Sequence, residues 1–266
     1  PFSKLDDIIP TKQKAFFGEV TYNITDHYSV VAGARYFDYE REKDSTLFTQ
    51  LFAPTAAGTF LWQDRVETIE ETGQNYKVGL NYTPNEDALF YAQWAEGFRI
   101  GSGLAPENQA CDLVDIATND QLDSDTSENI ELGFKSSLVD NRIVVNAAVY
   151  SIDWNDIPVI TNRGNNCNVE ENAGKAKAEG VELEIQAQLS ESFRADMSAS
   201  YGEATLVGDS NIGKDGDNLP GSADFNASLG LQYDFSLAGH DSFTRIDYTY
   251  VSEYFSSVDE ELSTST

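Results

Sequence analysis

Hydrophobic and polar residues alternate with a period of two through most of this chain. Between residues 179 and 189, five apolar side chains fall on one side of an extended chain, and glycine, glutamate and glutamine fall on the other. A period of two indicates a β-strand with two different faces, whereas an amphipathic helix repeats about every 3.6 residues. The same alternation predicts ten strands, at residues 16–24, 28–40, 75–82, 88–98, 129–138, 142–154, 179–189, 193–204, 225–233 and 243–250.

The connections between these strands are of two kinds. Short turns and long polar loops alternate strictly, which is typical of outer-membrane barrels with tight turns on one rim and long loops on the other. The predicted strands are also about ten residues long, against about five or six in soluble sheets. The short turns are expected at residues 25–27, 84–87, 139–141 and 190–192, and the long loops at 44–64, 99–127, 155–175 and 207–222.

These features favour an all-β fold. It is predicted to be an antiparallel transmembrane β-barrel segment of about ten long strands, with short periplasmic turns and long extracellular loops. In that fold Glu182 and Glu184 would line a wet lumen, while the side that carries Val181 would meet lipid. A soluble β-sandwich, which has one dry face and one wet face, is the alternative.

Composition and charge narrow the class of partner. The 266 residues are 40% hydrophobic and 12% aromatic, and they carry a formal net charge of -28. So large an acidic excess argues against a nucleic-acid partner, because phosphates would be repelled. No apolar run reaches the ~18 residues of a transmembrane helix, so a membrane would have to be crossed by strands.

We expect the sequence to be a piece of a longer chain. Residues 1–7 lack the apolar core of the signal peptide that an outer-membrane protein needs. Residues 260–266 form a polar tail, in place of a final strand that ends in an aromatic residue. Residues 1–266 are therefore interpreted as one partial barrel domain that is cut at both ends.

Four stretches in a fixed order resemble TonB-dependent receptors of the outer membrane. Tyr91–Arg99 reads YAQWAEGFR, and Ser124–Lys135 reads SDTSENIELGFK. Arg142–Ile157 reads RIVVNAAVYSIDWNDI, and Asn172–Glu184 reads NAGKAKAEGVELE. The resemblance covers roughly residues 75–190, and the flanking strands match in rhythm alone. The family implies a barrel of about 22 strands around an N-terminal plug domain. The plug, its Ton box and more than half of those strands are missing from this sequence.

The resemblance implies a function in transport. An outer-membrane receptor of this family would capture a scarce nutrient, most often an iron–siderophore complex, and import it with energy delivered by TonB through the plug. The expected surroundings and partners are outer-membrane lipid, a siderophore-like ligand and TonB. A passive small porin-like or structural barrel is the alternative. An outer-membrane protease or lipase is a third hypothesis, and we expect no enzyme activity.

Candidate ligand-binding residues follow from the loops, because receptors capture ligands with aromatic and polar side chains on long loops. Arg99 stands just inside a long loop and could meet an anionic ligand, or could pair with a lumen carboxylate such as Glu96 or Glu128. The ion pair is the favoured interpretation. The other candidates are Phe60 and Trp62, which follow Phe48 and Phe52 in the 44–64 loop, and Asn162 and Arg163 in the 155–175 loop.

Cys111 and Cys167 lie in two polar stretches rich in Asn and Asp. A pair of cysteines in such loops suggests a disulfide in an oxidising compartment, where it would join neighbouring extracellular loops and lower their entropy. Two unpaired thiols are the alternative.

The sequence offers little for catalysis or metal binding. His27 and His240 both fall in predicted turns, away from any nucleophile motif, and no G-x-S-x-G occurs. The carboxylate-rich stretch 112–128 lacks the ligand spacing and glycine of an EF-hand, so it is interpreted as a solvated acidic loop. No catalytic residue, metal or cofactor is expected.

Overall fold

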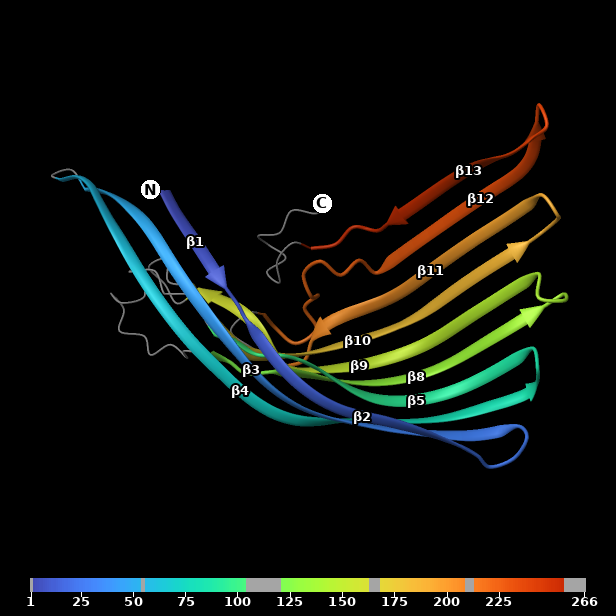
Figure 1. Ribbon diagram of the computed structural model, residues 1–266, viewed down its shortest axis with the longest axis horizontal. Helices are drawn as coiled ribbons and strands as arrows, with labels where there is room; N and C mark the ends of the chain where they lie inside the picture. The colour runs from blue at the N-terminus through green and yellow to red at the C-terminus, as the bar shows by residue number, and fades with distance from the viewer. Residues whose placement is uncertain (1, 54–55, 104–120, 163–167, 209–212, 256–266) are drawn as a thin grey trace.

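The computed structural model describes residues 2–53, 56–103, 121–162, 168–208 and 213–255. Within this part of the chain, eleven antiparallel strands form one strongly curved sheet (Figure 1). The predicted all-β fold is therefore confirmed, and the sheet is open along both edges. Among the described residues no helix is long and apolar enough to cross a membrane.

The strands follow one another around the sheet almost entirely in chain order. The eleven strands of this sheet are β1 (Phe2–Ile8), β2 (Thr11–Asn23), β3 (Tyr28–Ala53), β4 (Ala56–Asn85), β5 (Ala88–Arg99), β8 (Asp125–Leu138), β9 (Ile143–Asn162), β10 (Asn168–Gln188), β11 (Phe193–Leu206), β12 (Phe225–Leu237) and β13 (His240–Val251). The two short strands β6 (Ser102–Gly103) and β7 (Gln121–Leu122) pair with each other within the connection from β5 to β8.

The first two strands behave as one strand with a break. Both pair with β3 in a single register, which runs from Phe2 opposite Gln50 to Asn23 opposite Ser29. The break falls at Pro10, which has no backbone N–H to give to the ladder. Its carbonyl still accepts the Glu42 N–H at 3.1 Å, so the sheet continues across the break. The ten predicted strands thus match ten long strands, and the first extends further toward the N-terminus than its alternation indicated.

All four predicted short turns are confirmed, and they gather at one end of the sheet (Figure 1). Ala238 and Gly239 form a fifth tight turn at the same end, with φ of 52° and 80°. Positive φ at both central residues matches the twist of a two-residue hairpin. We call this end of the sheet the turn rim, and the opposite end the loop rim.

Two of the four predicted long loops are wrong. Residues 44–64 mostly extend a long hairpin, because β3 runs to Ala53 and β4 begins at Ala56. Residues 155–175 likewise extend the hairpin of β9 and β10. Beyond the apolar part of each strand, apolar and polar residues occur at positions of both faces, so strict alternation disappears although the strands remain paired. The connections from β5 to β8 and from β11 to β12 remain long, as predicted.

One face of the sheet carries exposed apolar side chains in a band, and we call it the outer face. On β3 this band runs from Tyr28 to Tyr36, and Asp38 and Glu40 follow it. Nine strand residues at about 3.3 Å each, tilted by about 40°, span roughly 20 Å, close to the apolar band of about 25 Å in membrane barrels. The band contains Val20, Val78, Leu80, Ile130, Leu132, Val149, Val181, Leu229, Ile246 and Tyr248, all more than one-third exposed.

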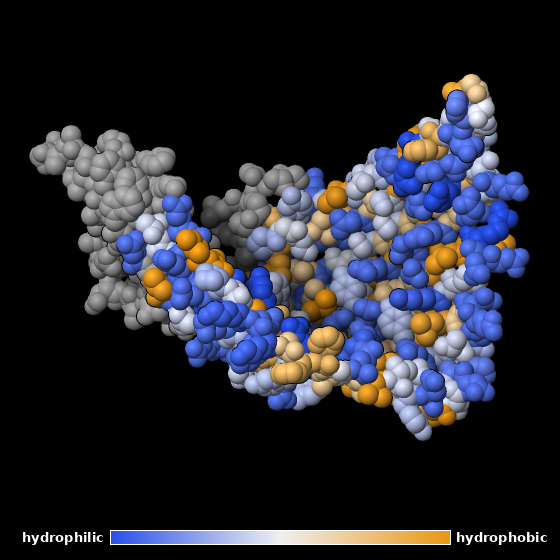
Figure 2. Space-filling view, in the orientation of Figure 1, coloured by the Kyte–Doolittle hydropathy of each residue, from blue (hydrophilic) through white to orange (hydrophobic). Residues whose placement is uncertain are grey.

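The opposite face, which we call the inner face, is polar and holds aromatic rings flat against glycines. Three glycines of the inner face lie directly across from a ring on the next strand: Gly73 across from Phe37, Gly133 across from Tyr91 and Gly180 across from Tyr150. A Cβ on Gly133 would come within 2.1 Å of the Tyr91 ring. The absence of a Cβ at Gly133 and Gly180 therefore lets these rings lie close against the neighbouring strand. Figure 2 shows hydrophilic side chains over much of the wall formed by β10 to β13.

Candidate ligand-binding site

The sheet is interrupted between β4 and β5. These strands pair from Asn85 and Ala88 at the turn rim up to Lys77 and Ala95, and no further. The next backbone N–H of β4, at Tyr76, donates instead to the side-chain Oε2 of Glu96 at 2.9 Å. A carboxylate therefore replaces the backbone partner at the point where the two strands separate.

Aromatic and aliphatic side chains fill the space that opens between the separated strands. The rings of Phe37 on β3 and Phe98 on β5 stack with centroids 3.8 Å apart. Phe37, Tyr39 and Ile69 are almost fully buried, and Ile100 packs against them. This small apolar cluster takes the place of backbone pairing as the contact between the two parts of the sheet.

A polar network continues the contact toward the loop rim. The Tyr39 hydroxyl and the Ser124 hydroxyl both donate to the Glu71 carboxylate. The Gly101 N–H donates to the Tyr39 oxygen at 3.2 Å. Tyr39 lies beyond the apolar band, and its burial, followed by the nearby Glu71, raises the pKa of its phenol. A phenol is protonated at neutral pH in any case, and the shift keeps this one a donor at more alkaline pH.

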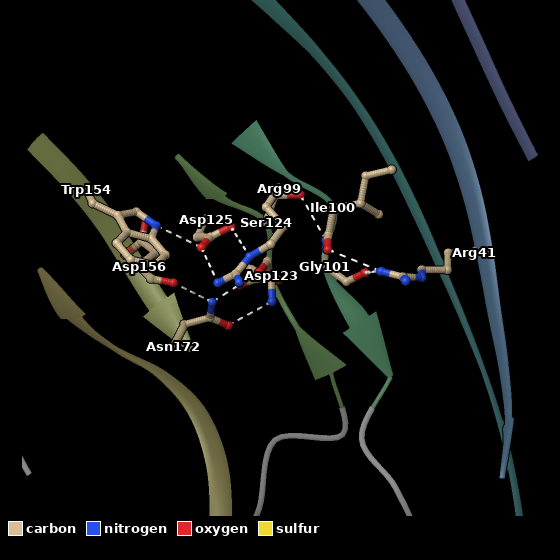
Figure 3. Close-up of polar contacts among 10 residues, drawn as sticks. All are labelled: Arg41, Arg99, Ile100, Gly101, Asp123, Ser124, Asp125, Trp154, Asp156 and Asn172. Carbon is tan, nitrogen blue, oxygen red and sulfur yellow. Dashed lines mark hydrogen bonds and ion pairs between the residues drawn. The ribbon is translucent and has the colours of Figure 1, made fainter. Parts of the chain in front are cut away.

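Arg41 ties the start of the long connection to β3. Its Nη1 donates to the carbonyls of Ile100 and Gly101, at 3.3 and 3.0 Å (Figure 3). Gly101 is buried, and a Cβ there would lie 2.2 Å from the carbonyl oxygen of Leu122. Only glycine allows the two ends of the connection to approach this closely.

Arg99 forms an ion pair, as favoured from the sequence, but with a different partner. Its Nη2 and Nε contact the two carboxylate oxygens of Asp125 at 2.6 and 3.1 Å (Figure 3). The expected partners Glu96 and Glu128 were wrong, because both alternate onto the outer face while Arg99 and Asp125 pair across the inner face. Asp125 is buried, and it also accepts the Trp154 indole N–H at 2.8 Å.

Trp154 completes the surroundings of Arg99. The guanidinium carbon of Arg99 stands 5.4 Å from the centroid of the Trp154 ring, a cation–π distance. The Arg99 side chain is still 60% exposed, although its charge is matched by a buried carboxylate. It can therefore contact a ligand from the lumen side, but it is not an uncompensated cation.

Asn172 joins the connection to β9 and β10. Its side chain accepts the Asp123 N–H at 2.8 Å, and donates to the carbonyls of Asp123 and Asp156 (Figure 3). The register between β9 and β10 shifts between Asn172 and Lys175, around Gly174. The backbone of the Asn-Ala-Gly stretch therefore forms a bulge. The connection between β5 and β8 is thus fixed at its base from both sides.

The remaining predicted site residues are placed only in part. The backbones of Phe60 and Trp62 belong to β4, and Asn162 is the last residue of β9. The side chains of these three residues lie outside the described part of the structure, as do Arg163, Cys111 and Cys167 entirely. The ligand-binding role of these residues and the disulfide stay predictions.

Five residues at the loop rim could not be recognised as partners from the sequence pattern: Tyr39, Glu71, Asp125, Trp154 and Asn172. Asp125 and Asn172 stand inside the family-like stretches, which marked them without giving them a role. Tyr39 and Glu71 come together only through the pairing of β3 with β4, which the predicted 44–64 loop obscured.

A wide hollow occupies the inner face nearer the turn rim, with a volume of about 550 Å³. Glu131, Glu182 and Glu184 face it from β8 and β10, and Lys135 is the one cation among its lining residues. Lys135 lies 5.7 Å from the Tyr91 ring, whose hydroxyl donates to Glu131. This wall is therefore acidic. Among the described residues no group of three or more His, Cys, Asp or Glu side chains is arranged to hold a metal ion.

Comparison with known proteins identifies the family. The family model described as TonB dependent receptor-like, beta-barrel matches residues 2–265. This chain belongs to the TonB-dependent receptor family. Members of the family are transport receptors of the bacterial outer membrane, so the resemblance drawn from the four sequence stretches is confirmed.

Curated relatives of this TonB-dependent receptor chain are distant in sequence. It is 23% identical over 175 residues to the metal-pseudopaline receptor CntO of Pseudomonas aeruginosa. The matched region covers 65% of this chain and 23% of that protein. It is 19% identical over 187 residues to the probable TonB-dependent siderophore receptor PiuA of Acinetobacter baumannii, covering 69% of this chain and 23% of that protein. The chain thus spans less than a quarter of the length of these two relatives.

Solved structures share the fold. The ferric yersiniabactin uptake receptor FyuA from Yersinia pestis superimposes with a TM-score of 0.75 at 17% identity, over 100% of this chain and 38% of that one. BauA, the ferric preacinetobactin receptor from Acinetobacter baumannii, superimposes with a TM-score of 0.67 at 14% identity, over 98% of this chain and 46% of that one. At this identity the likeness shows the fold alone.

Proposed function

We propose that this chain forms part of the barrel wall of an outer-membrane receptor that imports a metal chelate with energy from TonB. The observation that carries the proposal is the division of the sheet into a lipid-like outer face and a polar inner face, in a chain of this receptor family. A soluble protein rarely exposes a continuous apolar surface larger than a few hundred Å². Placing the outer face in the membrane removes that surface from water.

A siderophore-like chelate is the ligand that the loop rim fits best. Several relatives bear names of siderophore or metal-chelate receptors, and such ligands are large, polar and often anionic. The rim here supplies Arg99 and Trp154 on a rigid base, which suits contact with a ligand that arrives from outside. A rigid base lowers the entropy cost of binding.

Coupling to TonB requires a plug domain, which would occupy the space enclosed by the inner face. The acidic hollow lined by Glu131, Glu182 and Glu184 is suited to a basic surface of such a domain, because opposite charges fix position and orientation. In this arrangement the barrel wall holds the plug, and the loop rim holds the ligand.

Uptake by cells tests the proposal against the passive-barrel alternative. The complete receptor gene is deleted and then restored in an iron-limited strain, and uptake of ⁵⁵Fe-labelled chelates is measured with and without a functional TonB. We expect uptake that needs both the receptor and TonB. Uptake through the receptor that persists without TonB would support a passive barrel, and the absence of any receptor-dependent uptake would contradict import of an iron chelate.

A further inference from the structure

A second hollow lies on the inner face where β4 and β5 begin to separate, with a volume of about 400 Å³. Small residues on two strands line it, namely Gly33 on β3, and Ala95 and Gly97 on β5. A Cβ on Gly33 would be in ordinary van der Waals contact with Gly18, Glu19 and Lys77, at 3.6 to 3.7 Å, so these residues border the hollow closely. The hollow is distinct from the loop-rim network of Arg99 and Asp125.

One cation in this hollow has no anionic partner. Lys77 pairs with Glu19 at 3.2 Å, and Glu96 accepts the backbone N–H of Tyr76. Arg35 forms neither an ion pair nor a hydrogen bond with any residue in the described part of the chain, and its side chain is exposed. An arginine presents five donors in a fixed plane, which suits carboxylate, phenolate or catecholate oxygens.

Aromatic rings border the same cation. Phe17 lies directly across from Arg35 on β2, and it faces the lumen with 85% of its surface exposed. The Arg35 guanidinium carbon stands 5.7 Å from the centroid of Phe98, which also stacks on Phe37 and packs against the buried cluster. Lipid does not cover Phe17, because its side chain is on the inner face, so a ligand or the plug domain has to shield it from water.

We propose that this hollow binds the anionic aromatic part of a metal chelate, such as a catecholate or phenolate group. Arg35 contacts the ring oxygens, and Phe17 and Phe98 pack against the ring. The inference rests on the proposed receptor function and narrows its ligand to chelates with charged aryl groups. A chelate without a ring would leave Phe17 exposed to water, and a neutral chelate would gain no charge-assisted hydrogen bond from Arg35.

Three ferric complexes separate the effects of charge and ring. The probes are the ferric complexes of 2,3-dihydroxybenzoate (anionic and aromatic), benzohydroxamate (neutral and aromatic) and acetohydroxamate (neutral and without a ring). Their dissociation constants are measured with the complete receptor purified in detergent. We expect the dihydroxybenzoate complex to bind most tightly and the acetohydroxamate complex most weakly.

Variants assign the binding to this hollow. Arg35→Gln is expected to weaken binding of the dihydroxybenzoate complex by roughly tenfold to a hundredfold, and to leave the benzohydroxamate complex nearly unaffected. Phe17→Leu is expected to weaken both aromatic complexes by about threefold to tenfold. Lys12→Gln is the matched control for Arg35→Gln, because Lys12 is an exposed cation of the neighbouring strand β2, paired with Glu40 on the outer face.

Each contrary result has a defined meaning. If Arg35→Gln binds the dihydroxybenzoate complex as the wild type does, the site is wrong, and a lowered melting temperature of that variant would indicate that Arg35 contacts the plug instead. If wild-type receptor binds the acetohydroxamate complex as tightly as the others, or binds none of them, the ligand class is wrong. Uptake of another iron chelate by cells would then leave the proposed function standing, and its absence would remove both.

Discussion

The wall from β8 to β13 and the junction between β4 and β5 differ in how they are held together. Across the wall, every neighbouring pair of strands keeps one register over its length, except for the bulge around Gly174. At the junction, backbone pairing stops at Lys77 and Ala95, and side chains from β3, β4 and β5 and from Ile100 supply the contacts instead. Repeated backbone hydrogen bonds hold the wall together, whereas contacts between particular side chains hold the junction together.

The difference shows where function can be placed in such a sheet. A wall with all backbone groups paired can change its side chains freely on the inner face, because the ladder carries the structure. A junction held by side chains needs particular residues, and it leaves space for a hollow and for a fixed loop base. In the wall, the effect of a substitution on stability should therefore depend on whether the new side chain is polar or apolar. At the junction, it should depend on which contact the substitution removes.

The largest effect is expected from a charge on the outer face of the wall. Leu183→Arg places a cation in the middle of the apolar band of β10, and should lower the free energy of unfolding by about 2–4 kcal/mol. Ser200→Arg, on the inner face of the adjacent strand, is the matched control and should change it little. Urea titration of the complete receptor in lipid vesicles measures both, and equal losses would contradict the assignment of the faces.

The next effect concerns the glycine at the junction. Gly101→Ala brings a Cβ to 2.2 Å from the Leu122 carbonyl, so the backbone must move. We expect a loss of roughly 1–3 kcal/mol, or a displaced loop base with weaker ligand binding. Gly18→Ala has nothing within 4 Å and serves as the control. A crystal structure of the Gly101→Ala receptor with an unchanged base would show that the close approach is dispensable.

A smaller effect is expected from breaking the ion pair at the loop rim. Arg99→Gln leaves the buried Asp125 with the Trp154 indole as its remaining side-chain partner, and should cost about 1–3 kcal/mol. The double variant with Asp125→Asn should recover part of that loss, because the unmatched charge is then removed. A double-mutant cycle in urea measures the coupling, and a coupling near zero would place the pair among ordinary surface contacts.

The smallest effect is expected at Tyr39. Tyr39→Phe keeps the buried ring beside Phe37 but removes the hydroxyl that joins Glu71, Ser124 and Gly101. A loss of about 1 kcal/mol is expected, together with faster hydrogen exchange at the Gly101 amide. Unchanged exchange at Gly101, measured against the neighbouring amides of β5, would show that Ser124, which also accepts the Gly101 N–H, and Arg41 hold this segment without the Tyr39 hydroxyl.

The fold was predictable because lipid and water impose a period of two wherever a strand crosses the apolar band. That pattern predicted strands such as those that carry Val78 and Val181, and the four short turns that join neighbouring strands. It failed beyond the band, where residues 44–64 place apolar and polar residues at positions of both faces, so that only the backbone pairing reveals the hairpin. The candidate site was harder, because Tyr39, Ser124 and Asn172 meet through pairings that are distant in sequence. Arg99 was found, but its partner depended on which face each carboxylate occupies.

The most direct test of the central claim is the accessibility of alternate residues along β10. Spin labels are placed singly at residues 181 to 186 of the complete receptor in a bilayer, with Cys111 and Cys167 replaced by serine, and collisions with oxygen and with a water-soluble nickel chelate are measured. The two-faced sheet predicts high oxygen accessibility and low nickel accessibility at 181, 183 and 185, and lower oxygen accessibility at 182, 184 and 186, which face water or the plug. Equal oxygen accessibility at all six positions would contradict a lipid-facing outer face, and with it the proposed barrel wall.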